Sequence, residues 1–225
     1  MKPFKIPTSL ENFVSPYPKP QELLDVAHRG GESARLALAR LWLSEGIPYA
    51  FRTSPAVYES VRFWLSTRLE DVHAKEISVT GSARLGGSLA PQKLGKPFNE
   101  NSDLDIFIVS NPLFQKLKND FCHWASDFGS GVIKARGERE QKLWNHNKAR
   151  GAKLIERGFM DSWLIPNFPN YPTAKKMNDT MWRLVEMLKV THNAPRPKKA
   201  SVRCYSSWDS FARQMLLNLD PGRAE

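Results

Sequence analysis

Two carboxylates separated by one residue stand at the start of an apolar run near the middle of the chain. Asp103 and Asp105 flank Leu104, and the β-branched segment 106–109 that follows is typical of a buried strand. Because side chains at positions i and i+2 of a strand point to one face, the two carboxylates are expected to converge. Like charges so close repel each other, and a divalent cation relieves the repulsion. The spacing therefore predicts a metal-binding pair at the edge of an apolar core.

A glycine-rich turn precedes this pair. Residues 77–80 alternate apolar and polar side chains, which predicts a short strand that ends at Gly81. A strand that turns through Gly81 and Ser82 into a helix presents backbone N–H groups that suit a phosphate. A phosphate-binding turn followed by paired carboxylates favours metal-assisted phosphoryl or nucleotidyl transfer. The alternative interpretation is an ordinary turn followed by a solvated strand start.

A further carboxylate stands inside a later apolar run. Residues 158–166 begin with glycine and end with proline, and they predict a strand with Asp161 in its middle. A carboxylate in such a run is costly if it is isolated, and a metal site would stabilise it. The alternative is an edge strand on which Asp161 faces outward.

The ordered combination of Gly81-Ser82, Asp103-Leu104-Asp105 and an apolar strand resembles the signature of the DNA polymerase β-like nucleotidyltransferase superfamily. The resemblance implies that Gly81 and Ser82 hold the nucleotide phosphates. It implies that Asp103 and Asp105 bind two Mg²⁺ ions, with Mn²⁺ as an alternative. It also implies that Asp161 completes the metal site and helps to deprotonate the attacking hydroxyl. The resemblance covers the central third of the chain, where the loop before Asp103 is longer than is usual in the superfamily.

The reaction expected from this resemblance is transfer of a nucleoside monophosphate from a nucleoside triphosphate to an acceptor hydroxyl, with release of pyrophosphate. The acceptor is left open between an RNA 3′ end, a nucleotide and a protein. Arg84 and Lys153 are candidate cations for the nucleotide phosphates. One alternative is an enzyme that makes a cyclic or linear oligonucleotide signal. Another is an inactive nucleotidyltransferase-fold module that binds RNA or a partner protein.

The composition narrows the class of protein and of partner. A formal net charge of +10 over 225 residues favours an anionic partner, either a triphosphate or RNA. The two cysteines, Cys122 and Cys204, show neither zinc nor disulfide spacing, which predicts a cytoplasmic location. No segment has the apolar length expected of a membrane span, so no membrane partner is expected.

The sequence pattern and the resemblance together predict an α/β (α+β) fold, with a mixed-sheet nucleotidyltransferase core and helical additions at both ends. Residues 1–75 are expected to form an arm and helices packed on the core. Residues 76–172 are expected to form the catalytic core, and 173–225 a helical and strand extension of the same compact unit. Apolar periodicity predicts helices over 21–44 (interrupted at Gly30-Gly31), 55–73, 111–126, 138–156, 173–190 and 206–219, and short strands over 131–135 and 201–205.

Overall fold

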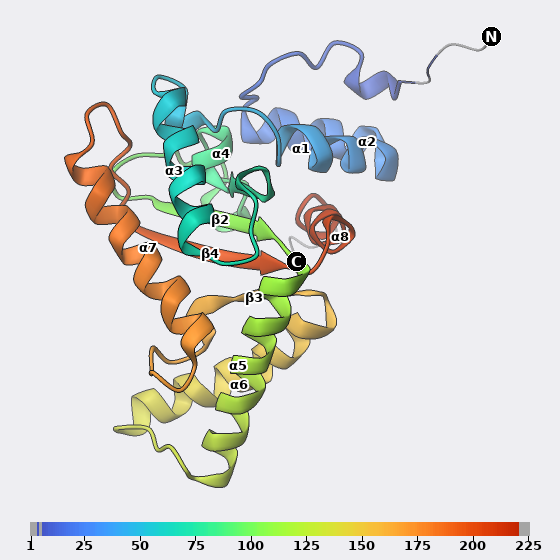
Figure 1. Ribbon diagram of the computed structural model, residues 1–225. Coiled ribbons are helices and arrows are strands. Elements are labelled where there is room, and N and C mark those ends of the chain that lie inside the picture. The colour runs from blue at the N-terminus through green and yellow to red at the C-terminus, as the bar shows by residue number, and fades with distance from the viewer. Residues whose placement is uncertain (1–3, 5, 221–225) are drawn as a thin grey trace.

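A four-stranded mixed sheet lies at the centre of the molecule (Figure 1). The computed structural model describes residues 4 and 6–220. The strand order is β1-β2-β4-β3, in which β2 and β4 run parallel and both outer strands pair antiparallel with their neighbours. The expected mixed-sheet α/β class with helical additions is confirmed. The strands are β1 (Ile77–Thr80), β2 (Asp103–Val109), β3 (Phe159–Asp161) and β4 (Lys199–Tyr205).

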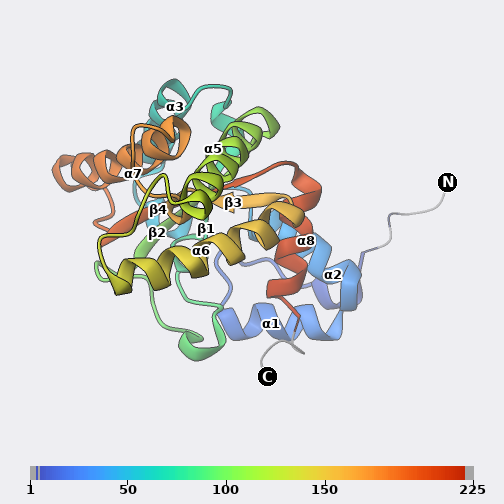
Figure 2. The ribbon, with the colours of Figure 1, turned by 90° about the horizontal axis from the view of Figure 1, so that it is seen from below.

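Helices cover both faces of this sheet, as the view from below shows (Figure 2). One face is covered by α3, α5 and α7, and the other by α1 and α8, while α6 runs along the sheet beside β3. Among the described residues, no helix combines the length and apolar character needed to cross a bilayer. The helices are α1 (Pro20–Arg29), α2 (Gly31–Ala37), α3 (Pro55–Arg68), α4 (Ser82–Leu85), α5 (Asn111–Ser130), α6 (Glu138–Glu156), α7 (Pro172–Val190) and α8 (Trp208–Asn218).

Side-chain alternation along β2 divides the apolar core into two layers. Ile106 and Ile108 face the layer that contains the buried residues of α3, α5 and α7. Phe107 and Val109 face the layer that contains residues of α1 and α8. Asp105 shares the second face because it is two residues from Phe107. The carboxylate pair therefore lies at the open end of a face whose other end is sealed by apolar packing.

The strand β4 comes from the last part of the chain but lies inside the sheet. It inserts between β2 and β3, both of which precede it in sequence. The segment 76–172 thus supplies three of the four strands, and 173–225 supplies the remaining one, α8 and all but the first residue of α7. The core and its expected extension are parts of one sheet.

The short strand predicted over 131–135 does not form, and this prediction is wrong. Gly131 ends α5 in a left-handed conformation with φ of 77°. The residues after it form an irregular loop that leads to α6, and Val132 is exposed. An apolar pair such as Val132-Ile133 makes a strand only where another strand offers it a partner, and no described strand lies there.

Candidate active site

The structure brings the Gly81 turn to the carboxylate pair. In the sheet, Asp105 pairs with Thr80 of β1 on one side and with Ser201 of β4 on the other. The Ser201 hydroxyl donates a hydrogen bond of 2.7 Å to Asp105 Oδ1. On the β1 side, a Cβ atom placed on Gly81 would lie 3.4 Å from Asp105 Oδ2. Ser201 of β4 and the turn after β1 thus meet around this one carboxyl group of β2, and Asp103 lies on the same face of that strand.

Gly81 is required at this turn by its backbone conformation. Its φ of 68° and ψ of −150° lie in a region that is essentially restricted to glycine. The chain passes there from β1 directly into α4, which starts at Ser82. A side chain at position 81 would be strained and would also narrow the space beside Asp105.

Arg84, expected among the nucleotide-binding residues, is placed by the structure against the backbone of a distant segment. Its side chain is buried, and Nε donates to the carbonyl of Trp42 at 2.7 Å. Nη1 donates to the carbonyl of Gly46 at 3.0 Å. The guanidinium therefore fixes the segment 42–46 against α4, and it does not line the pocket that contains Asp103 and Asp105.

The electrostatic environment of Asp105 disfavours its negative charge. Burial is the largest cause and raises the pKa of this carboxyl, and the charges of Asp103 and Asp161 raise it further. The hydrogen bond from Ser201 and the charge of Arg203 act in the opposite direction. The net shift is upward, so added positive charge beside Asp105 would stabilise its ionised form.

Asp161 lies at the end of β3 and is held by arginines. Its side chain shares the sheet face of Asp105, but β4 lies between the two strands. Arg203 of β4 donates from Nε to Asp161 Oδ1 at 2.6 Å and from Nη2 to Oδ2 at 3.0 Å. Arg150 of α6 adds a contact of 3.5 Å to Oδ2. Asp161 is only 4% exposed, so two guanidinium groups supply the positive charge that its burial requires.

The donor set therefore differs from the expected three-carboxylate metal site. Among the described residues, no group of three or more His, Cys, Asp or Glu side chains is arranged to hold a metal ion. Asp103 and Asp105 remain as a pair, and Mg²⁺ is commonly held by one or two carboxylates together with substrate phosphates and water. The raised pKa of Asp105 fits such an ion. The residues present thus suit a cation that arrives with a phosphorylated substrate.

A pocket of about 720 Å³, called here the carboxylate pocket, opens beside Asp103 and Asp105. Two tryptophans on its wall are unusually accessible, with Trp163 45% and Trp182 66% exposed. Trp163 belongs to the short turn after Asp161. This turn is joined to α7 by a hydrogen bond of 2.7 Å that the Ser162 hydroxyl donates to Asn178 Oδ1. The remaining polar lining residues include Ser201, Asn178, Glu186, Lys189, Lys198 and Lys199.

Lys153 lies in a different place from the carboxylate pair. It projects from α6 into a second pocket of about 450 Å³, called here the basic pocket. Arg150 and Arg203 also line this pocket, and both contact Asp161. Lys153 and Asp105 therefore line different pockets, and the basic pocket contains the two arginines that contact Asp161.

The residues that sequence analysis missed lie mainly on β4. Along this strand, Lys199, Ser201 and Arg203 alternate with Ala200, Val202 and Cys204. That period of two predicts one polar and one apolar face, and the polar face is the one that meets Asp105 and Asp161. The alternation was a usable signal, but nothing in it identified β2 as the partner strand.

Comparisons of this chain with protein-family models, with curated proteins and with solved structures find no match.

Proposed function

We propose that this protein is a divalent-cation-dependent nucleotidyltransferase that moves a nucleoside monophosphate from a nucleoside triphosphate to an acceptor hydroxyl, releasing pyrophosphate. The observation that carries the proposal is the approach of Gly81 to the Asp105 carboxyl group, with 3.4 Å between a Cβ placed on Gly81 and Oδ2. A phosphate bound by the backbone at Gly81 and Ser82 would lie beside the carboxylate pair. This juxtaposition agrees with the resemblance in the sequence.

Asp103 and Asp105 would hold the cation, which is Mg²⁺ or Mn²⁺. When bound, such an ion offsets charge on the phosphate oxygens and stabilises the entering and leaving oxygens of an in-line displacement. The chain's own contribution is to fix the carboxylates: Ser201 orients Asp105, and Lys199 lies 3.3 Å from Asp103. Both partners belong to β4, so this strand sets the geometry of the pair.

The carboxylate pocket supplies groups for the rest of the nucleotide. The exposed rings of Trp163 and Trp182 offer faces on which a base can stack. Lys198 and Lys199 lie in the same pocket as the carboxylates and can bind the phosphates that leave as pyrophosphate. In the proposed role of binding the nucleotide phosphates, Lys198 and Lys199 thus take the place of Arg84, because they are accessible to a substrate.

Asp161 is assigned the general-base role only in a state in which its ion pair with Arg203 has opened. In the described state both of its oxygens accept hydrogen bonds from guanidinium groups. A carboxylate must be within hydrogen-bond reach of the proton that it removes. While the ion pair is closed, Asp161 positions Arg203 in the wall of the basic pocket.

The ion pair also favours a second candidate function, a nucleotidyltransferase-fold module that binds RNA without catalysis. A site whose third carboxylate is permanently held by arginine retains two carboxylates and a strongly basic surrounding. Such a module would bind phosphodiester chains, with an affinity that falls as the salt concentration rises. Calorimetry that detects RNA binding without Mg²⁺-dependent turnover would favour it.

The test is incubation with each α-³²P-labelled nucleoside triphosphate and Mg²⁺ or Mn²⁺, with and without tRNA. Labelled tRNA indicates an RNA acceptor, a small labelled product indicates an oligonucleotide signal, and labelled protein indicates protein modification. Asp103→Ala and Asp105→Ala are expected to abolish transfer, while Asp209→Asn on the exposed start of α8 keeps the wild-type rate. Wild-type transfer by the Asp105→Ala variant would refute the mechanism.

A further inference from the structure

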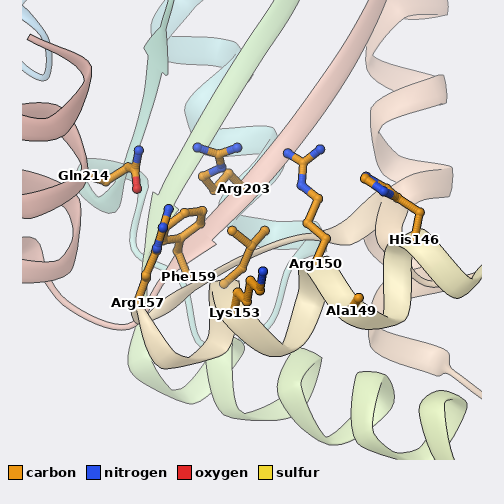
Figure 3. A pocket seen from close by; sticks show the side chains of 9 residues that line it. His146, Ala149, Arg150, Lys153, Arg157, Phe159, Arg203 and Gln214 are labelled. Atoms are coloured by element: carbon orange, nitrogen blue, oxygen red, sulfur yellow. The ribbon is translucent and has the colours of Figure 1, made fainter. Parts of the chain in front are cut away.

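We propose that the basic pocket binds a phosphate group together with its neighbouring sugar hydroxyl, the unit found in a mononucleotide and at the 5′ end of a nucleic-acid strand. The pocket lies between α6, β3, β4 and α8, on the sheet face that carries Asp161 (Figure 3). Its volume of about 450 Å³ is within the usual range for small-ligand sites. Its polar lining consists of His146, Arg150, Lys153, Arg157, Arg203 and Gln214.

The positive charge of the basic pocket favours a ligand with two negative charges. Four lining side chains are cationic, at positions 150, 153, 157 and 203, and Asp161 is the carboxylate that Arg150 and Arg203 contact. One carboxylate offsets one of the four charges. A phosphomonoester carries roughly −1.5 to −2 near neutral pH, whereas a carboxylate ligand carries only −1. The excess of positive charge therefore favours a terminal phosphate.

Helical spacing explains why these cations face one direction. His146, Arg150, Lys153 and Arg157 recur at intervals of four, three and four residues along α6 and just past its end, which places them on one side of the helix. Figure 3 shows Arg150 and Lys153 projecting from this helix toward the same space as Arg203. Lys148, on the same helix, does not line the pocket, so the pocket's charge results from this spacing and not from the charge of α6 as a whole.

Gln214 supplies an independent indication of a ligand. This side chain of α8 lines the pocket and is only 9% exposed. Its Nε2 donates to Asn218, but its Oε1 has no hydrogen-bond partner among the described residues. A buried carbonyl oxygen without a partner costs free energy that a donor from a ligand would recover. A phosphate oxygen is not such a donor at neutral pH, but a sugar hydroxyl is.

Apolar and aromatic groups complete the wall on which a sugar can rest. Phe159 and Leu154 line the pocket, and the Arg203 guanidinium lies over the Phe159 ring at 4.7 Å from its centroid. Arg150 lies over the ring of Trp163 at 5.2 Å, and Trp163 belongs to the carboxylate pocket. The two pockets are therefore adjacent where Arg150 of the basic pocket lies over Trp163 of the carboxylate pocket. If the proposed transfer reaction is correct, the ligand of the basic pocket is the acceptor.

The proposal is tested by calorimetric titration in the absence of triphosphate and divalent cations, so that binding is separated from transfer. The ligands are AMP, adenosine, 2′,3′-dideoxy-AMP, inorganic phosphate, and a single-stranded RNA of about ten nucleotides with and without a 5′-phosphate. We expect AMP or the 5′-phosphorylated RNA to bind, and the unphosphorylated forms to bind at least about ten-fold more weakly. If the 5′-phosphorylated RNA binds more tightly than AMP, the ligand is a strand end. If AMP binds more tightly than the RNA, the ligand is a mononucleotide.

Variants on the exposed side of the pocket test the assignment without disturbing the core. Lys153→Ala and Arg157→Ala are each expected to weaken binding about ten-fold, whereas Lys148→Ala, the matched control on α6, changes it by less than about two-fold. Gln214→Leu is expected to weaken AMP binding and to leave dideoxy-AMP binding unchanged. Thermal melts check that each variant is folded.

Three results would overturn the proposal. If adenosine bound as tightly as AMP, the phosphate group would make no contribution to binding. If inorganic phosphate bound as tightly as AMP, the sugar hydroxyl would make none. Equal losses in Lys148→Ala and Lys153→Ala would show that general positive charge explains the binding. Failure of this proposal is distinguishable from failure of the proposed transfer reaction. If the protein binds AMP in this pattern but transfers no nucleotide, the proposal for the basic pocket stands and the proposed enzymatic activity does not.

Discussion

Arg203 donates two hydrogen bonds to Asp161 across the β3–β4 pair, from Nε to Oδ1 at 2.6 Å and from Nη2 to Oδ2 at 3.0 Å. This contact joins the two pockets, because Arg203 lines the basic pocket while the charge of Asp161 acts on Asp105. A change at either residue is therefore expected to alter both the stability of the sheet and the chemistry beside it.

Arg203→Met is expected to lower the free energy of unfolding by roughly 3–5 kcal/mol, because it leaves the buried Asp161 carboxylate without its main partner. Arg203→Lys should recover part of the loss, since one ammonium cannot reproduce the two-bond geometry. Urea denaturation followed by tryptophan fluorescence measures both. The control is Lys199→Ala, which removes a more exposed ion pair with Asp103 and should cost at most about 1 kcal/mol. Equal losses of stability in Arg203→Met and Lys199→Ala would show that the Arg203 contact is not specially stabilising.

Gly81→Ala is expected to cost about 1–3 kcal/mol of stability, because its φ of 68° and ψ of −150° strain any side chain. The new methyl group would also stand 3.4 Å from Asp105 Oδ2, so nucleotide binding should fall further than the stability loss explains. Gly95→Ala is the matched control: its φ is 74°, and a Cβ placed there would have no neighbour within 4 Å. Stability is read from urea denaturation and nucleotide affinity from calorimetry. If the two variants bind nucleotide equally well, Gly81 has no role at the site.

Asp105→Asn is expected to stabilise the protein in the absence of divalent cations while abolishing transfer. Burial and neighbouring carboxylates raise the pKa of Asp105, so its ionised form is costly at neutral pH, and the amide removes that charge while its oxygen still accepts from Ser201. Saturating Mg²⁺, at about 100 times its Kd, should stabilise the wild type by roughly 2.7 kcal/mol and the variant by much less. Differential scanning calorimetry with EDTA or Mg²⁺ measures both effects. An identical response of the two proteins to Mg²⁺ would remove Asp105 from the metal site.

Trp182→Ala is expected to raise the KM for the triphosphate by about ten-fold or more, since stacking on an aromatic ring contributes roughly 1–3 kcal/mol per base. The side chain is 66% exposed, so the fold should be unaffected. Trp182→Phe keeps a stacking face and should retain most of the affinity. Phe63→Ala, which removes an exposed ring from α3 outside both pockets, is the control and should leave KM unchanged. A KM that is insensitive to Trp182→Ala would place the base elsewhere.

The two cysteines are expected to react at very different rates. Cys122 is exposed, whereas Cys204 is buried in β4, and burial raises the pKa of its thiol from 9.0 to about 12. Because only the thiolate reacts, Ellman's reagent at pH 8 should modify one thiol per folded chain and two in urea. The folded state also holds the Cys204 proton more tightly than the unfolded state. Its contribution to stability is therefore complete below pH 9 and is lost as pH rises toward 12. Rapid modification of both thiols in the folded protein would contradict this.

The fold class and the carboxylate pair were predictable from the sequence because both depend on short-range periodicity. The alternation at 77–80, the Asp103–Asp105 spacing and the helix at 138–156 each reflect local backbone geometry. The pairing of β4 with β2 was not predictable, since Asp105 and Ser201 are separated by a long stretch of chain and strand register depends on the assembled core.

The placements of Arg84 and Asp161 that the sequence did not indicate have a common physical cause. The charge of Arg84 indicated a phosphate ligand, but in the folded chain its guanidinium donates hydrogen bonds to the carbonyls of Trp42 and Gly46. Asp161 indicated a metal ligand, but Arg203 neutralises it. In both cases the charge was recognised from sequence, and the partner that decides its role comes from a distant segment.

The insertion of β4 between two earlier strands has a consequence for biosynthesis. A nascent chain that ends before Lys199 already contains Asp103, Asp105 and Asp161, yet β2 and β3 have no strand to hold them in one sheet. Asp105 would then lack the hydrogen bond from Ser201, and Asp161 would lack its ion pair with Arg203. During translation the carboxylate pocket and the basic pocket therefore remain incomplete until β4 has been synthesised, because residues of that strand line both pockets.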